Sequence, residues 1–197
     1  KTAYEIMPSL VGSEMCIRDR YYSWPGAGFD AEGRQREYMR EIDAISQRLG
    51  MEISVDEKPL HEPESIERFM NEVKVQKPDG LLLIPFQKGE WSSVERIVGE
   101  TEIPTVILVP IGILLNPQIN TLYRRPGVYL INSLDNFEAL EYGMRMIRTA
   151  RWMSESRIVN VAGTKTGESR VDDVFGTRVR TIPLERYSEE FKRTEIT

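Results

Sequence analysis

Cysteine and histidine are almost absent from this chain of 197 residues, which contains one of each, Cys16 and His61. A single cysteine cannot form a disulfide within the chain, and it cannot supply the several thiolates of a structural metal site. His61 lies beside Glu62 at the expected entrance of a helix, where we interpret it as a solvated side chain. The sequence therefore predicts no metal site within this chain.

An excess of basic residues and a long apolar run are also missing. The chain has 26 Lys and Arg against 31 Asp and Glu, a net charge of −5. This balance argues against a nucleic-acid partner and fits a small-molecule ligand. The longest apolar stretch, PTVILVPIGILL, contains Pro104 and Pro110 and is shorter than the ~18 residues of a membrane span. We therefore expect no nucleic-acid partner and no membrane partner.

The first twenty residues, KTAYEIMPSLVGSEMCIRDR, resemble the conceptual translation of a sequencing adapter, and the resemblance stops at Tyr21. We expect residues 1–20 to be non-native and poorly packed; a genuine N-terminal strand is the alternative. Cys16 lies in this segment, so the remainder has no cysteine and is compatible with any compartment. We also expect that a native first strand, preceding the loop YYSWPGAGFD, is missing.

Helical and strand patterns alternate from residue 30 onward. The expected helices cover residues 31–49, with Asp30 as N-cap and Gly50 as the stop; residues 63 to the Lys77-Pro78 pair; about 92–99; a segment capped by Asp135 and Glu138 that carries Phe137 to Ile147; and 184–193. The expected strands cover residues 51–55, 80–85, 105–109, 128–132, 157–162 and 178–182. This alternation predicts an α/β fold with a doubly wound, mostly parallel sheet of the flavodoxin or Rossmann kind.

The domain organisation follows from a change of pattern near Glu155-Ser156, where a long arginine-rich helix gives way to a new strand. Residues 21–155 are expected to form an N-terminal α/β domain that lacks its first strand. Residues 156–197 are expected to be the truncated start of a second α/β domain. The segment AGTKTGES at residues 162–169 has Glu168 where a phosphate-binding loop has Lys, so we interpret it as a plain βα loop.

Candidate binding residues are those that follow the predicted strands, because ligands of open α/β sheets bind at the carboxyl ends of the strands. Aromatic and amide side chains suit a sugar, whose C–H faces pack on rings while its hydroxyls form hydrogen bonds. The candidates for substrate binding are Trp24, Phe86, Gln87, Ser133 and Asn136. Each also has a purely structural interpretation, such as Trp24 packing on its neighbour Pro25. The pattern identifies no catalytic residue.

Three stretches carry a family resemblance: KPDGLLLIPFQKGEWSSVERIVGETEIPTVILV, NSLDNFEALEYGMRMIRTARWMSESRIVNVAG and GTRVRTIPLERYSEEFKR. Together they resemble the N-terminal region of L-fucose and L-arabinose isomerase-like proteins. The resemblance implies an oligomeric aldose–ketose isomerase that uses a divalent metal, usually manganese, held mainly by later domains. It further implies that this chain supplies sugar contacts, at Trp24, Phe86 and Gln87, and is inactive alone.

Two alternatives remain open. A sugar-binding module of the type 1 periplasmic or repressor-like class has the same strand–helix texture and binds sugars without converting them. A divergent isomerase homologue that has lost its metal site is the other.

Overall fold

The computed structural model describes residues 30–55, 60, 63–85, 91–110, 116–167 and 169–194. The chain divides into two compact units, Lys1–Ile147 and Arg148–Thr197. The expectations for residues 1–20 and for a first strand lie outside the described residues. The division falls within a helix, whereas the sequence pattern changes near Glu155-Ser156, so the domain assignment stays a prediction.

The first unit contains a parallel sheet of three strands, β1 (Leu81–Leu83), β2 (Thr105–Val109) and β3 (Val128–Asn132), in the order β1-β2-β3. Every residue of β1 and β2 is buried. Continuous apolar strands of this kind are typical of a parallel sheet covered on both faces. The structure thus confirms an α/β arrangement with a parallel sheet.

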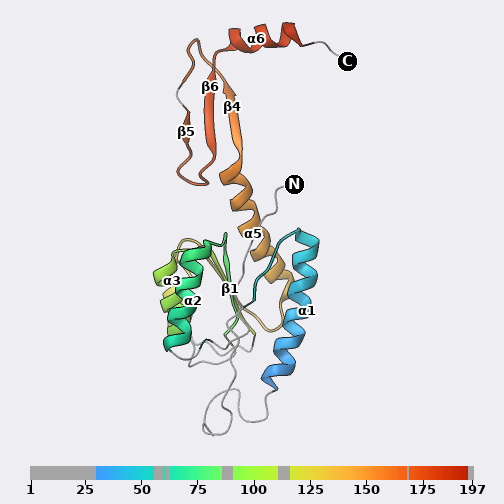
Figure 1. The fold of residues 1–197 in the computed structure, drawn as a ribbon, viewed down its shortest axis with the longest axis vertical. Coiled ribbons are helices and arrows are strands. Elements are labelled where there is room, and N and C mark those ends of the chain that lie inside the picture. The colour runs from blue at the N-terminus through green and yellow to red at the C-terminus, as the bar shows by residue number, and fades with distance from the viewer. Residues whose placement is uncertain are drawn as a thin grey trace. The chain divides into compact units, whose positions relative to one another are not determined.

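Helices cover both faces of this sheet (Figure 1). Leu81, Leu83 and Ile107 pack in one apolar cluster with α2 (Pro63–Gln76), α3 (Trp91–Thr101) and α4 (Asn116–Leu122). The intervening strand residues, such as Leu82, face a second cluster formed with α1 (Ala31–Leu49) and the first turns of α5 (Phe137–Glu155). The alternation follows from the two-residue period of a strand.

Local sequence signals explain where α1 and α2 begin and end. The Asp30 side chain accepts a hydrogen bond from the Gly33 N–H at 2.8 Å, and Gly50 closes α1 with a left-handed φ of 60°. Pro63 begins α2, in which Ile66, Phe69, Met70 and Val73 are buried on one face, whereas Val75 is exposed. These features confirm the two predicted helices.

The structure differs from the predicted elements at three places. Residues 51–55 are not assigned as a strand, because they pair with none of the described strands, although Met51 is buried and Ile53 and Val55 pack on the second cluster. The helix α4 was not predicted. The loop at residues 162–167 is not a βα loop, since it leads to the short strand β5 (Arg170–Val171) and not to a helix.

The second unit comprises the last turns of α5, the strands β4 (Arg157–Val161), β5 and β6 (Arg178–Ile182), and α6 (Leu184–Arg193). β6 is the central strand of this sheet, parallel to β4 and antiparallel to β5. Thr177 is the one described residue of this unit that is buried. In the described part of the chain, no helix is both long and apolar enough to cross a membrane.

Candidate functional site

The loop after β3 holds two of the five predicted binding residues, Ser133 and Asn136. The Asn136 Nδ2 donates to the Ser133 Oγ at 3.5 Å, so the structure brings these two side chains together at the carboxyl end of the sheet. Trp24, Phe86 and Gln87 lie outside the described residues, as does His61. Their predicted roles stay predictions.

Asn136, and not Asp135, is the N-cap of α5. Its Oδ1 accepts a hydrogen bond from the Ala139 N–H at 3.0 Å, and the helix begins at Phe137. The predicted cap by Asp135 is therefore wrong. Asp135 adopts a left-handed backbone with φ of 50°, which Asp tolerates better than most residues, and its side chain contacts α1.

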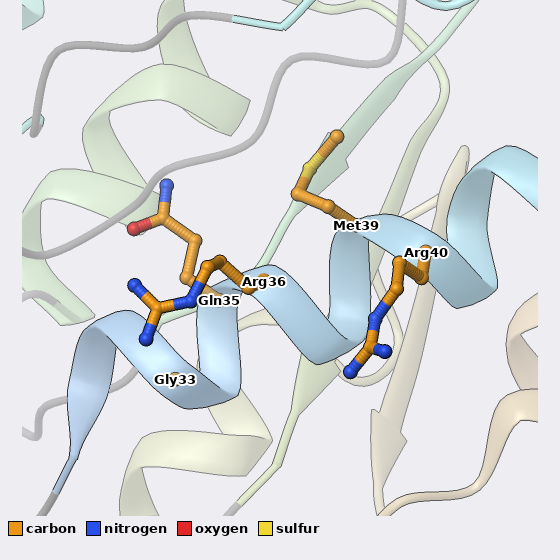
Figure 2. Close-up of a pocket in the computed structure, with 5 residues that line it drawn as sticks. All are labelled: Gly33, Gln35, Arg36, Met39 and Arg40. Carbon is orange, nitrogen blue, oxygen red and sulfur yellow. The ribbon is translucent and has the colours of Figure 1, made fainter.

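A pocket of about 820 Å³ opens beside the first turns of α1 (Figure 2). Its described lining residues are Gly33, Gln35, Arg36, Met39 and Arg40, all from this one helix. Ligand sites collect polar groups that converge from several elements. Because the described part of this lining comes from a single helix, we do not place the site here.

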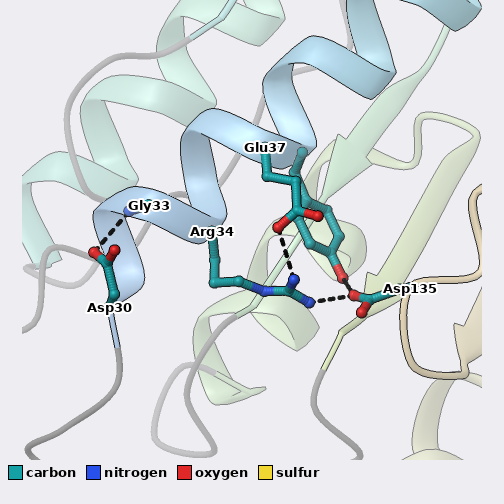
Figure 3. Close-up of polar contacts among 6 residues, drawn as sticks. Asp30, Gly33, Arg34, Glu37 and Asp135 are labelled. Carbon is teal, nitrogen blue, oxygen red and sulfur yellow. Dashed lines mark hydrogen bonds and ion pairs between the residues drawn. The ribbon is translucent and has the colours of Figure 1, made fainter.

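A polar cluster joins α1 to the loop after β3 (Figure 3). We name it the Asp135 cluster; it comprises Arg34, Glu37, Tyr38 and Asp135. The Asp135 Oδ1 accepts hydrogen bonds from the Arg34 Nη2 and from the Tyr38 hydroxyl. The Arg34 Nη1 donates to the Glu37 Oε2 at 2.7 Å. The cluster therefore ties the beginning of α1 to the carboxyl end of the sheet.

Aromatic packing holds the cluster in place. The Tyr38 side chain is buried in the second apolar cluster, and its ring meets that of Phe137 edge-on, with centroids 5.0 Å apart. The Arg34 guanidinium carbon lies 5.4 Å from the Tyr38 ring centroid, within the range of a cation–π contact. The Tyr38 ring thus belongs to the core while its hydroxyl belongs to the polar cluster.

The cluster moves the pKa of each of three members away from neutrality. The hydrogen bond with Asp135 raises the pKa of Arg34, and the hydrogen bond from Arg34 lowers the pKa of Asp135. Burial, followed by the hydrogen bond to Asp135, raises the pKa of Tyr38. A group that exchanges protons in catalysis works best with a pKa near the operating pH. These three side chains are therefore suited to binding and positioning.

A second pocket, of about 490 Å³, adjoins this loop beside β3 and the first turns of α5. Its lining includes Asn136, the aromatic rings of Tyr129 and Tyr142, and the ion pair of Glu141 and Arg145. The two ring centroids are 5.9 Å apart, and the Glu141–Arg145 distance is 2.9 Å. Rings, an amide and charged hydrogen-bonding groups are the side chains that suit a sugar. We refer to this pocket as the β3–α5 pocket.

Sequence reasoning missed Arg34, Tyr129 and Tyr142 as site residues. Tyr38 lies within the predicted helix at residues 31–49, and the partner of its hydroxyl lies 97 positions away. Tyr142 lies on the predicted helix that carries Phe137 to Ile147, but no sequence signal marked it as a site residue. No local pattern marked the pairing of Arg34 with Asp135.

In the described part of the chain, no group of three or more His, Cys, Asp and Glu side chains is placed to hold a metal ion. Compared with known proteins, the chain matches no protein-family model and no curated protein.

Proposed function

We propose that this chain is the N-terminal part of an aldose–ketose isomerase-like protein and that its β3–α5 pocket contributes sugar contacts. The observation that carries the proposal is the meeting of Asn136, Tyr129 and Tyr142 in one pocket, which extends along β3 and α5 from Asn136, after the carboxyl end of β3, to Tyr129, near its amino end. Ligands of open α/β sheets bind at the carboxyl ends of the strands, where Asn136 lies. In the parent protein, a metal such as Mn²⁺ would be held by other domains, and the parent would be a homo-oligomer.

The placement of the helices supports a flavodoxin-like, doubly wound sheet as the fold. Connections between parallel strands are right-handed, so α3 and α4 lie on one face as the sheet advances from β1 to β3. α2, which connects residues 51–55 to β1, lies on the same face. The same rule therefore puts residues 51–55 on the side of β1 that faces away from β2. α1 lies on the opposite face. The connection through α1 to residues 51–55 must therefore cross the sheet in the opposite direction, which is a reversal of winding before residues 51–55.

This reversal leaves one strand position between residues 51–55 and β1, giving the flavodoxin-like order in which the second strand lies outside the first. The intervening position also explains why residues 51–55 pair with none of the described strands. Both sugar isomerase-like domains and sugar-binding modules of the type 1 class are compatible with such a sheet.

The pKa directions in the Asp135 cluster support binding over proton transfer. Arg34 and Asp135 are charged and Tyr38 is neutral across the physiological pH range already at their ordinary pKa values, and the contacts of the cluster displace each pKa further from neutrality. The same observation favours a second candidate function, a sugar-binding module of the type 1 periplasmic or repressor-like class. In both proposals this part of the molecule holds a sugar without reacting with it.

The experiment has two parts. Calorimetry measures binding while the full chain is titrated with L-fucose and with L-arabinose. A ketose assay with and without Mn²⁺ then measures turnover. The isomerase-like proposal expects weak binding and no turnover, because the metal ligands are elsewhere. Saturable binding with a dissociation constant of about 1 μM, which is a binding free energy of about −8.2 kcal/mol, favours the binding module. Turnover by this chain alone contradicts both proposals.

Variants of the pocket test the site itself. Tyr142→Ala removes an exposed ring from the β3–α5 pocket and should weaken sugar binding about tenfold, or about 1.4 kcal/mol. Tyr123→Ala is the matched control, since Tyr123 is also an exposed tyrosine and does not line this pocket. Equal binding by both variants would remove the pocket from the proposal.

A further inference from the structure

A third pocket, of about 340 Å³, lies at the amino end of the parallel sheet of the first unit. We name it the α3–β3 pocket. Its described lining comes from the last turn of α3, the loop that leads to β2, the turn before β3 and β3 itself: Val98, Glu102, Ile103, Arg125, Pro126 and Val128. Ligand sites combine an apolar lining with a few polar groups that converge from several elements. The α3–β3 pocket has this composition.

The apolar part of the lining is aliphatic. Val98 is buried in the first apolar cluster, and Ile103 and Val128 pack against the same cluster. Neighbouring residues of a strand point to opposite faces of the sheet, so Val128 lies on one face and Tyr129 on the other, with the second cluster. The α3–β3 pocket is therefore separated by the sheet from the β3–α5 pocket, and it can take a different ligand.

A tight turn fixes Arg125 at the edge of the pocket. The Val128 N–H donates to the Arg125 carbonyl oxygen at 3.1 Å, with Pro126 second in the turn and Gly127 third, at φ of 80°. This is the arrangement of a type II turn. The Thr105 N–H donates to the Gly127 carbonyl oxygen at 2.8 Å, which ties the turn to the beginning of β2. Local sequence and sheet pairing together hold the backbone that carries Arg125.

The Arg125 side chain is suited to bind a carboxylate. It is half-buried, and its Nη2 donates to the Gly99 carbonyl oxygen at 3.4 Å. Its other N–H donors have no partner among the described residues. A guanidinium presents five N–H donors in a planar fork, which matches the two oxygens of a carboxylate. Arg125 therefore gives the pocket a positive side with donors to spare.

The opposite charge comes from Glu102, the first residue after α3. Within the described part of the chain, Glu102 forms no side-chain hydrogen bond and no ion pair, with Arg125 or with any other residue. The carboxyl end of a helix also carries the negative end of its dipole, on carbonyl groups that lack a helical partner. Both features favour a cation at this side. The pocket thus has a negative and a positive side that are not paired with each other.

We propose that the α3–β3 pocket binds a free α-amino acid with an aliphatic side chain. The ligand carboxylate binds Arg125, its ammonium group binds Glu102 at the end of α3, and its side chain packs on Val98, Ile103 and Val128. A simple carboxylic acid leaves Glu102 without a partner, and a simple amine does the same to Arg125. This binding site is additional to the sugar contacts and does not depend on them.

A series of ligands tests the three contacts in the unaltered full chain. Calorimetry compares L-leucine with isocaproate, which lacks the ammonium group, with isoamylamine, which lacks the carboxylate, and with glycine, which lacks the side chain. L-Leucine should bind, and each of the other three should bind at least about tenfold more weakly, because it leaves one part of the lining without a partner. Absence of leucine binding would overturn the proposal, as would equal binding of all four ligands.

Variants of the two charged residues test the placement of the site. Arg125→Gln and Glu102→Gln should each weaken leucine binding at least about tenfold. Arg124→Gln is the matched control, because Arg124 is the exposed neighbour of Arg125 and is not among the lining residues. Far-UV circular dichroism of each variant checks that the fold remains. Leucine binding by Arg125→Gln or Glu102→Gln as strong as that of Arg124→Gln would overturn the proposal.

Tyr142→Ala separates this site from the β3–α5 pocket. Tyr142 lines the β3–α5 pocket and not the α3–β3 pocket, so its replacement should leave leucine binding unchanged. A loss of leucine binding in Tyr142→Ala would place the amino acid in the other pocket and would overturn the proposal. Failure of the chain to bind sugars would leave the leucine result unaffected.

Discussion

Two sheets in one molecule differ in what covers them. In the first unit β2 (TVILV) is apolar along its whole length and buried on both faces by helices. In the second unit β4 (RIVNV) and β6 (RVRTI) mix arginines and other polar residues with apolar ones, and β4 is exposed throughout. The comparison teaches that backbone pairing and core formation are separate requirements. The sheet of the first unit has both its backbone pairing and its apolar core within that unit. The sheet of the second unit has only the backbone pairing.

A matched pair of isoleucine truncations gives the largest expected difference. Ile107→Ala in β2 removes a side chain that is 0% exposed and should lower the unfolding free energy of the first unit by about 2–5 kcal/mol. Ile158→Ala in β4, where the side chain is 47% exposed, should cost less than about 1 kcal/mol. Urea unfolding, monitored by circular dichroism, measures the loss of unfolding free energy in each variant. Equal losses would mean that the two sheets have similar cores in solution.

Glycine substitutions test how closely α5 approaches the first sheet. A Cβ at Gly143 would lie 2.8 Å from the Tyr129 ring and 3.0 Å from Val106, so Gly143→Ala should cost about 1–3 kcal/mol. Gly99→Ala in α3 meets no atom within 4 Å and should stabilise the helix by about 0.5–1 kcal/mol. Thermal unfolding of the two variants should therefore shift in opposite directions. A gain in stability at Gly143 would contradict the packing.

Two substitutions at Asn136 separate its cap role from its predicted sugar contact. Asn136→Ala loses the hydrogen bond to the Ala139 N–H and should destabilise the first unit by about 1 kcal/mol. Asn136→Asp keeps an accepting oxygen, so stability should stay near that of the parent. If the amide also donates to a sugar, Asn136→Asp should still weaken binding of L-fucose or L-arabinose in the calorimeter. Unchanged binding would leave Asn136 with the cap role alone.

The pH dependence of the Asp135 cluster gives the smallest effect. The pKa of Asp135 is lower in the folded chain than in the unfolded chain because Arg34 donates to it. Its stabilisation is therefore complete above the ordinary aspartate pKa of about 3.9 and is lost as the pH falls through the lower folded value.

The Asp135 contribution should be about 1 kcal/mol or less, since the carboxylate is 37% exposed and solvent screens the ion pair. Asp135→Asn should remove this acid dependence and leave the dependence of the other carboxylates intact. The midpoint of unfolding, measured between about pH 2 and 5 for both chains, checks the difference. An unchanged acid profile in the variant would show that the ion pair does not stabilise the fold.

Local signals were sufficient for most elements of the molecule. The ranges of β2, β3, β6 and α6 follow from apolar runs and helical spacing, because each range depends on residues close in sequence. The ends of α1 follow from Asp30 and Gly50 for the same reason. The short elements α4 and β5 escaped prediction, since seven and two residues carry too little periodicity.

The sequence by itself determined that the chain alternates helices and strands, that the β1 and β2 strands are buried, and that Ser133 and Asn136 follow a strand. Only the tertiary structure decided that Arg34 meets Asp135, 101 positions away, and that the β3–α5 pocket gathers Tyr129, Tyr142 and Asn136. It also decided that residues 51–55 stay unpaired in the described sheet and that no described residue of α6 is buried. The physical reason is that helix and strand propensity depend on neighbours along the chain, whereas an ion pair, a ladder or a covered face requires a partner brought close by folding.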